Sequence, residues 1–486
     1  MAEPQETRRP VASHSSASPV PAAPSAPSLP GSPAAPAVAA APLPPGDAGW
    51  PLLGETLPFL KDGFGFVASR TARHGPIWQT RILGRRTAVL AGPDASGRFI
   101  DSEVQRAGAM PPHVQELFGG SSLPLLDGDP HLSRKTFILQ AFTRDALAGY
   151  LPVIERMVAE ALERWAGQEE IVWIPELKRL SIEVICATVM GIPPGAETEA
   201  LRADYQQVLR AFSHLPVPLP GTAYSRGRAA LARILTRFEA AIAEHRREPR
   251  NDGLSRILAA TDGAGRQIGV EECKVELHHL IIAGLIVFAE LAAIVQQLTR
   301  HPDVRTRLET ELAGLPEGRE SGGVGSGAGS GLTHQALAGA SYLLQVVMEV
   351  KRLCPILPVL FGKARQSFEF KGRTVPAGWM VLWAHRASHV TAEIYPDPER
   401  FDPERFAPAR GEHLRHPYAF VPHGAGPAHG HRCPGTDFAT TLMQVFTILL
   451  LRDYTWELPP GQDLDYDWSL IPPEPKDGLR ARVRRR

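Results

Sequence analysis

The chain has 486 residues, and its 52 Lys and Arg residues balance its 52 Asp and Glu residues. This balance argues against a nucleic-acid-binding protein, which normally carries a basic excess. Hydrophobic residues make up 43%, which is ordinary for a folded enzyme with a large core. The four cysteines are scattered and form no C-x-x-C pair, which favours a reducing compartment, the cytoplasm, over a disulfide framework.

Two segments have the composition of unstructured chain. Residues 1–42 are mostly Ala, Pro and Ser, which cannot bury a core and therefore predict a disordered tail. Residues 317–331 are rich in Gly and Ser and predict a flexible surface loop between two helices. We expect residues 43–486 to form a single domain.

The pattern between these segments is mostly helical. Apolar residues recur at spacings of three and four in 144–167, 175–192 and 228–248. The run from Val270 to Thr299 predicts one long helix at the centre of the protein, apolar around most of its middle. Its apolar stretch is interrupted by Glu290 and is short for a bilayer, so we expect no transmembrane segment.

Strand patterns are few. They occur in "IWQTRILGRRTAVLAG" near the front, in "FEFKGRTVPAGWMVLWA" after residue 368, and in "DGLRARV" at the tail. The sequence therefore predicts a mainly α fold with a small β region.

The stretch "PHGAGPAHGHRCPGTDF" (422–438) contains three histidines and Cys433. Structural zinc usually takes four ligands, often as two spaced pairs, and only one cysteine is available here. A single thiolate in a Gly-rich loop, followed by an apolar helix, fits a heme iron better. The N-terminus of that helix would stabilise a thiolate. Cys433 is therefore the predicted iron ligand, with His431 and Arg432 suited to the heme propionates.

Two further motifs accompany this loop, and the three together form a recognisable pattern. Glu349 and Arg352 in "MEVKRLCP" lie three residues apart on one helix face, and Arg405 follows in "YPDPERFDPERF". With these motifs in this order and spacing, the chain resembles the cytochrome P450 superfamily from residue 43 to 486. The resemblance implies a triangular helical prism with a long central helix over heme b (iron protoporphyrin IX). It also implies that Glu349, Arg352 and Arg405 form a buried ion network that braces the heme loop.

The resemblance extends to particular branches. The start "PPGDAGWPLLGETLPFLKDG" and the end "PPEPKDGLRARV" are similar to the branch of cyanobacterial and retinoid-hydroxylating members. The Cys loop is lengthened and is similar to that of the peroxygenase branch, which uses hydrogen peroxide.

Further propionate contacts follow from the same resemblance. It implies His131 as a propionate contact and Lys135 beside it, in "GDPHLSRKTFILQAFT". A second propionate cation of the family would fall at Gly362, which leaves Lys363 as a weaker candidate.

The central helix departs from the family pattern. Most members carry an acid and an alcohol that relay protons, and here Ile286 and Val287 replace them and cannot carry a proton. Gly284 is expected to keep a groove for oxygen, and Leu285, Ile286 and Val287 are expected to line the substrate pocket. The Arg-Pro that anchors fatty acids in peroxygenases is also missing, because Ile282 and Ala283 stand at those positions.

Glu290 lies four residues after Ile286 and hence on the same helix face. Two interpretations stay open. It is a displaced acid that reaches the distal pocket, or it pairs with a neighbouring element.

The resemblance predicts a heme-thiolate oxidoreductase that oxidises or hydroxylates an apolar small molecule. It would act as a monooxygenase, with electrons from a separate ferredoxin or reductase partner, or with hydrogen peroxide. The alternatives are a heme-thiolate isomerase or dehydratase that needs no redox partner, and a heme sensor without turnover.

Overall fold

The computed structural model describes residues 41–486 except 52, 213, 316–330 and 355. The tail expected at 1–42 and the loop expected at 317–331 fall almost wholly outside the described residues. Ala41–Arg486 form one compact unit.

Helices provide most of the described structure. The longer ones, of eight residues or more, are α2 (Gly63–His74), α3 (Pro93–Ile100), α5 (Gly128–Leu139), α6 (Arg144–Ala166), α7 (Trp173–Met190), α8 (Ala196–Phe212), α9 (Ala223–Arg247), α11 (Val270–Leu285), α12 (Phe288–Arg300), α13 (Pro302–Ala313), α15 (Ser341–Leu353) and α17 (Thr436–Asp453). Shorter helices connect them: α1 (Thr56–Lys61), α4 (Pro112–Leu117), α10 (Gly253–Ala259), α14 (His334–Gly339), α16 (Arg386–His389), and the 3-10 turns η1 (Leu123–Leu125), η2 (Gln140–Phe142), η3 (Pro403–Phe406) and η4 (Glu412–Leu414).

The β structure is confined to small sheets. The largest has the strand order β1 (Ile77–Ile82), β2 (Arg85–Ala91), β8 (Met380–Ala384), β5 (Leu360–Ala364), β3 (Val104–Gln105). Only its β2–β8 pairing is parallel, with Val89 opposite Leu382. The other strands are β4 (Ile171–Val172), β12 (Arg480–Arg485) and β9 (Tyr454–Glu457) in one sheet, β6 (Phe368–Phe370) with β7 (Arg373–Val375), and β10 (Tyr466–Asp467) with β11 (Glu474–Pro475).

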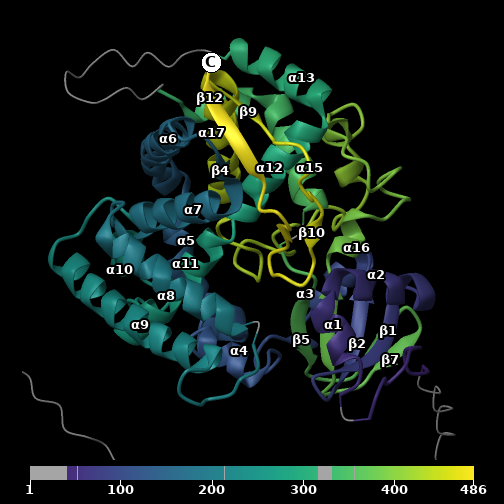
Figure 1. Cartoon of the computed structure of the whole chain (residues 1–486). Helices are drawn as coiled ribbons and strands as arrows, with labels where there is room; N and C mark the ends of the chain where they lie inside the picture. The colour runs from purple at the N-terminus through teal and green to yellow at the C-terminus, as the bar shows by residue number, and fades with distance from the viewer. Residues whose placement is uncertain (1–40, 52, 213, 316–330, 355) are drawn as a thin grey trace, which may run out of the picture. The chain divides into compact units, whose positions relative to one another are not determined.

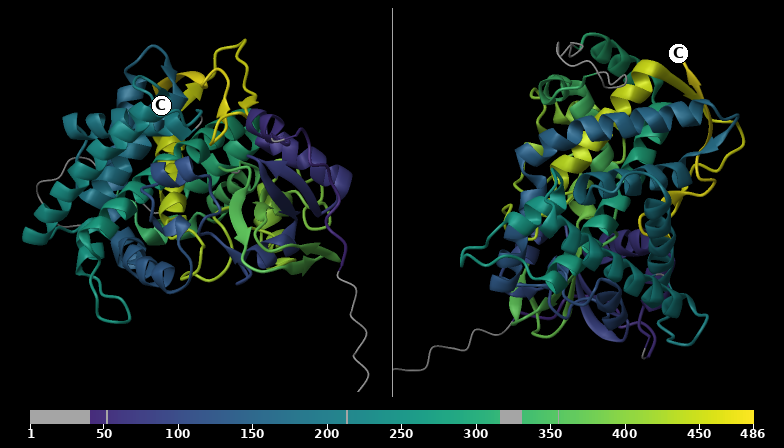
Figure 2. Two further views of the ribbon diagram at one scale, coloured as in Figure 1. Left: turned by 90° about the horizontal axis from the view of Figure 1, so that it is seen from below. Right: turned by 90° about the vertical axis from the view of Figure 1, so that its left-hand side faces the viewer.

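The sheets and the helices occupy different parts of the molecule. Strands β1, β2, β5 and β7 gather beside α1 and α2, and helices α7 to α10 lie on the opposite side (Figure 1). Helix α17, yellow in the figures, runs between other helices in each view (Figure 2). Its side chains from Phe438 to Leu451 are mostly buried in the main apolar core, together with those of α6, α7, α11 and α12. The helix that follows Cys433 is thus fixed by burial on nearly all sides.

Most predicted elements are confirmed. The periodic segments form α6, α7 and α9, and the three strand patterns form β1–β2, β6–β8 and β12. Thr143 caps α6 because its hydroxyl accepts the N–H of Ala146, and Gly191 ends α7 in the left-handed conformation.

The predicted long central helix is present from Val270 to Arg300, with one irregular turn in its middle. It divides into α11 and α12 at Ile286 and Val287. Around this point the N–H groups of Val287, Ala289 and Glu290 donate to carbonyls three residues earlier, in place of four. A tightened turn of this kind bends a helix locally. It lies where the family's proton-relay pair would stand.

The segment Val270–Arg300 is long and apolar enough to span a membrane by composition, but 83% of its apolar window is buried inside the protein. This burial is that of a core helix, as the sequence predicts.

Candidate heme site

The loop of Cys433 is shaped by glycines. Gly424 and Gly426 have φ of 86° and 95°, a region that side chains strongly disfavour. The N–H of Cys433 donates to the carbonyl of His423 at 2.9 Å, which closes the loop. Cys433 itself is half-buried and stands three residues before the first residue of α17.

The sulfur of Cys433 faces donors. The main-chain N–H of Gly435 donates to it, and Lys135 and Lys351 lie close enough to favour its charged form. Burial nevertheless dominates and raises the pKa of the Cys433 thiol. Coordination of a metal ion by the sulfur would favour the thiolate, in the same direction as the Gly435 N–H and the two lysines.

Glu349, Arg352 and Arg405 come together in a fully buried ion network. Arg352 donates to both carboxylate oxygens of Glu349, at 2.6 and 2.8 Å, and Nε of Arg405 lies 3.4 Å from Glu349 Oε1. Arg405 also pairs with Glu412 at 3.0 Å, a partner that the motifs did not predict. All four side chains are 3% exposed or less.

This network is connected to the Cys loop. Arg352 donates to the carbonyl of His389 at 2.6 Å, and Nε2 of His389 accepts the N–H of Val421 at 2.9 Å. Val421 directly precedes the stretch 422–438. These contacts connect the network, called the brace below, to the start of the loop.

A second cluster lies beside the loop. The rings of His131 and His431 are 4.0 Å apart, and Nε2 of His431 is 3.6 Å from Asp127 Oδ1. Lys135 donates to the carbonyl of Arg432, whose own side chain is exposed. Burial lowers the pKa of His131 to about 3, with help from His431 and Lys135, and burial lowers the pKa of Lys135 to about 8.

Arg106 belongs to the same cluster and was missed in the sequence. Asp127 accepts the main-chain N–H of Arg106, and Arg106 as a whole residue is 7% exposed. The positive charges of Arg106 and Lys135 outnumber the single carboxylate of Asp127, and the rings of His131 and His431 add neutral N–H donors. The ring nitrogen Nε2 of His131 is buried and has no hydrogen-bond partner among the described residues. A surplus of buried donors fits a ligand that carries carboxylates, as heme does.

Packing explains why glycine stands at position 362, where the family resemblance predicts a cation. A Cβ at Gly362 would stand 2.5 Å from Val104 Cγ1 and 2.8 Å from the ring of Phe99. A residue with a larger side chain therefore does not fit at this position. The guanidinium of Arg106 lies 4.0 Å from the centre of that Phe99 ring. Lys363, the weaker candidate, is half-buried on β5, and its main chain pairs with Gln105 and Met380. No side-chain contact joins it to the cluster within the described residues.

The central helix presents one partly exposed stripe. His279, Ala283 and Ile286 are half-buried and follow at i, i+4 and i+7, whereas Leu285 and Val287 are 5% exposed and belong to the core. Of the three residues expected to line the pocket, Ile286 therefore has the most accessible surface, and the pocket role of all three stays a prediction. Hydrophobic burial between α11, α12 and α7 accounts for the low exposure of Leu285 and Val287.

Gly284 packs against α7. A Cβ at this position would stand 2.4 Å from Cγ1 of Ile185, so any larger residue would push the two helices apart. The space that the missing side chain leaves is thus occupied by Ile185. A role of Gly284 toward oxygen stays a prediction.

Glu290 pairs with the Cys loop. Its Oε1 lies 3.0 Å from Nε2 of His423, and the side chain is 2% exposed. Burial raises the pKa of Glu290, but the nearby charges of Lys351 and His423 outweigh burial and lower it overall. The carboxylate is therefore ionised at neutral pH and holds no proton to donate. The contact supports the second interpretation, pairing with a neighbouring element.

His278 on the central helix forms a hydrogen bond to Leu117, the last residue of α4. Its Nε2 donates to the carbonyl of Leu117 at 2.8 Å, and its ring stacks on Tyr205 at 5.6 Å. The side chain has no exposed surface, and burial lowers its pKa to about 4.

A pH dependence follows from His278. Between pH 6.5 and 4 the unfolded chain binds a proton that the folded chain does not, so stability falls as the pH falls. The shift corresponds to about 3 kcal/mol lost between pH 7 and 4. His278→Gln keeps an N–H for Leu117 but does not titrate, and urea unfolding of this variant across that range should show a smaller loss. His429→Gln, in an exposed loop position, should follow the unmodified protein, and equal slopes for all three would contradict the assignment.

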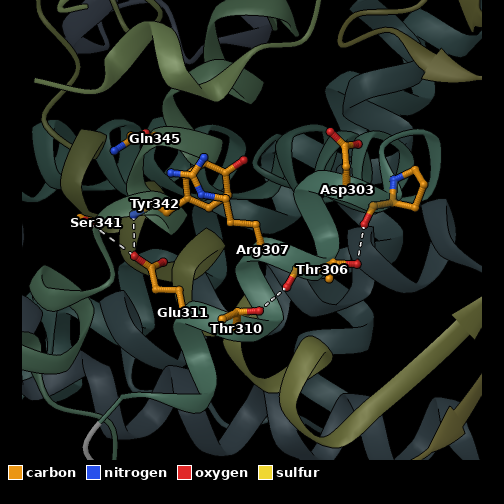
Figure 3. Close-up of a pocket in the computed structure, with 9 residues that line it drawn as sticks. Asp303, Thr306, Arg307, Thr310, Glu311, Ser341, Tyr342 and Gln345 are labelled. Atoms are coloured by element: carbon orange, nitrogen blue, oxygen red, sulfur yellow. Dashed lines mark hydrogen bonds between the residues drawn. The ribbon is translucent and has the colours of Figure 1, made fainter. Parts of the chain in front are cut away.

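A surface groove between α13 and α15 is separate from these residues. It is lined by Asp303, Thr306, Arg307, Glu311 and Tyr342 with their neighbours, and none of the candidate heme residues lines it (Figure 3). Glu311 accepts the N–H groups of Tyr342 and Leu343 at the start of α15, so its polar groups serve to cap that helix.

The comparisons agree with this architecture. The family model of cytochrome P450 matches residues 44–476. The putative cytochrome P450 120 of Synechocystis is 33% identical, over 90% of this chain and 96% of that protein. The solved structure of retinoic-acid-bound cyanobacterial CYP120A1 is 32% identical, has a TM-score of 0.82 and covers 92% of this chain and all of that one. P450 OleT with arachidonic acid, at 22% identity and a TM-score of 0.77, covers 92% of this chain and 99% of its own and shares the fold.

A thiol-bearing glycine loop, a buried Glu–Arg brace and a cluster of donors on this helical scaffold define a heme-thiolate protein. The chain belongs to the cytochrome P450 family, as the match over 44–476 shows. It is accordingly an oxidoreductase that uses heme b, and the fold expected from the motifs is confirmed.

Proposed function

We propose that this enzyme oxidises an apolar small molecule at a heme held by Cys433. The observation that carries the proposal is the position of the Cys433 sulfur, which faces the N–H of Gly435 in a loop fixed by α17 and by the Glu349–Arg352 brace. Bound heme supplies the chemistry that inserts oxygen into a C–H bond.

The residues around the loop have separate tasks. His131, His431, Lys135 and Arg106 supply donors for the propionates and so orient the heme. The apolar stripe of Ala283 and Ile286 lines the space where the substrate lies and helps to exclude water. His278 and Glu276 hold the segment 117–123 over this space, through the carbonyl of Leu117 and the N–H of Leu123 at 2.8 Å.

The substrate class is suggested by similarity. The neighbour at 32% identity is named for its bound retinoic acid, a polyene acid of isoprenoid type. The stripe on the central helix is compatible with such a molecule because it is apolar apart from His279. We propose a retinoid-like or other long apolar substrate, and we expect the enzyme to act in the cytoplasm.

The choice of oxidant has a specific observation behind it. Ile286 and Val287 replace the acid and alcohol that relay protons when oxygen is used, and Glu290, which could have replaced the acid, is engaged by His423. This favours hydrogen peroxide over oxygen with a ferredoxin-type partner. Loss of the relay is equally compatible with an isomerase or dehydratase that needs no electrons.

The decisive experiment compares oxidants on one substrate panel. Purified holoenzyme is given retinoids and long-chain fatty acids with peroxide alone, or with reductase, ferredoxin and NADPH. We expect hydroxylated product with peroxide at roughly tenfold or more the rate of the reductase system. Product only with the reductase system would reject the peroxide route, and product of unchanged oxidation state with neither oxidant would identify an isomerase or dehydratase.

A further inference from the structure

His423 links the Cys loop to the central helix. Its carbonyl accepts the N–H of Cys433 at 2.9 Å, and its ring nitrogen Nε2 lies 3.0 Å from Oε1 of Glu290. The two ring partners are 133 residues apart in the sequence. One residue thus contacts both the predicted iron ligand and the helix on which the proton relay is missing.

Glu290 has few alternatives to this contact. The side chain is 2% exposed, and its second oxygen, Oε2, has no hydrogen-bond partner among the described residues. The other ring nitrogen of His423, Nδ1, is also buried without a partner there. A buried carboxylate without its partner is strongly unfavourable, so the contact fixes both side chains.

Lys351 adds a second charge beside Glu290. Its side chain is 3% exposed on α15, its Nζ donates to Thr440 on α17 at 2.8 Å, and it is close enough to Glu290 and Cys433 to interact with both charges. The cation therefore stands between the helix that bears Glu290 and the helix that follows the Cys loop.

The contact between Glu290 and His423 holds the loop at a second point, separate from the Glu349–Arg352 brace. The start of the loop is held at Val421 by His389, which belongs to the Glu349–Arg352 brace. His423 is a second anchor two residues later, and it is attached to α12 just beyond the break at Ile286 and Val287. Gly424, with φ of 86°, follows immediately and lets the chain turn away toward Cys433.

We propose that Glu290 and His423 are positioning residues, which hold the Cys433 loop against the central helix and so set the geometry of the iron–sulfur bond. The proposal rests on the proposed function, in which Cys433 is the heme ligand. Glu290 then acts on the Cys433 loop through His423. Positioning of this loop, and not proton delivery, is its proposed role.

The test measures ligation as well as turnover. His423→Leu and Glu290→Leu remove the contact but leave the main-chain carbonyl of residue 423 in place. We expect the ratio of non-thiolate to thiolate heme, read from the carbon-monoxide difference spectrum of the reduced holoenzyme, to rise about tenfold or more. The heme reduction potential should shift in the same variants.

Matched variants separate positioning from simple destabilisation. His423→Gln can still donate to Glu290 and should restore the unmodified spectrum and potential. His429→Leu, exposed in the same loop, should leave both unchanged. If the leucine variants do not fold, His423→Asn, which is polar but too short to reach Glu290, should show the same tenfold change.

Two outcomes have different meanings. A folded His423→Leu or His423→Asn protein with the spectrum and potential of the unmodified enzyme would overturn the positioning role. A thiolate spectrum that is absent in the unmodified holoenzyme would instead reject Cys433 as the ligand, and with it the proposed function.

Discussion

Replacing Cys433 by alanine should abolish the carbon-monoxide difference band that thiolate-ligated heme gives on reduction. Cys433 is the half-buried cysteine in the glycine-turned loop, and the Gly435 N–H and two lysines surround its sulfur. Without the sulfur no other side chain of the loop is placed to supply a thiolate, so substrate oxidation should fall to background. Difference spectroscopy and product analysis on the purified variant provide the measurement.

The matched control is Cys354→Ala. Cys354 is also half-buried, but its sulfur lies 3.9 Å from the hydroxyl of Tyr466, and burial raises its pKa to about 12. This variant should keep the thiolate band. Loss of the band in Cys354→Ala together with its survival in Cys433→Ala would reverse the assignment.

Removing Arg352 should have the largest effect on stability. Arg352→Leu leaves Glu349 buried with Arg405 at 3.4 Å as its remaining guanidinium partner, and it strips a donor from the carbonyls of His389 and Pro398. Breaking a buried pair in this way costs about 3–5 kcal/mol. That is a large share of the stability of most proteins, so little heme-loaded protein should be recovered. Urea unfolding followed by circular dichroism measures the difference.

Two comparisons check the cause. Arg307→Leu removes an exposed ion pair with Glu404, whose partners are 54% and 37% exposed, and should cost under about 1 kcal/mol. The double variant Arg352→Leu with Glu349→Leu removes both charges and should recover part of the loss. Equal destabilisation by Arg307→Leu and Arg352→Leu would show that burial of the charges is not the cause.

Local patterns predicted much of the site. Glu349 and Arg352 are three residues apart on a helix, so their contact follows from helical geometry alone. The single cysteine among glycines, followed by an apolar helix, likewise identified the candidate ligand before any fold was known. The helical segments and the strand pairs were predictable for the same reason, because each depends on periodicity over neighbouring residues.

Contacts between distant segments were not predictable in this way. Glu412, which pairs with Arg405, and Arg106 and Asp127, which complete the cluster near His131, stand in no motif. A buried arginine near a turn gives no periodic signal. Similarly, the sequence does not show that Ile185 and Phe99 fill the space that a side chain at Gly284 or Gly362 would need.

The sequence by itself determined the helical scaffold and the contact between Glu349 and Arg352, because short-range spacing fixes which side chains share a helix face. It also predicted the ligand loop from a single cysteine among glycines. The tertiary structure alone decided which partner Glu290 has. Its position four residues after Ile286 permitted an acid in the distal pocket, but packing of α12 against the Cys loop places His423 at 3.0 Å from its carboxylate. A buried charge takes the partner that the fold brings within reach, and sequence spacing does not show which partner that is.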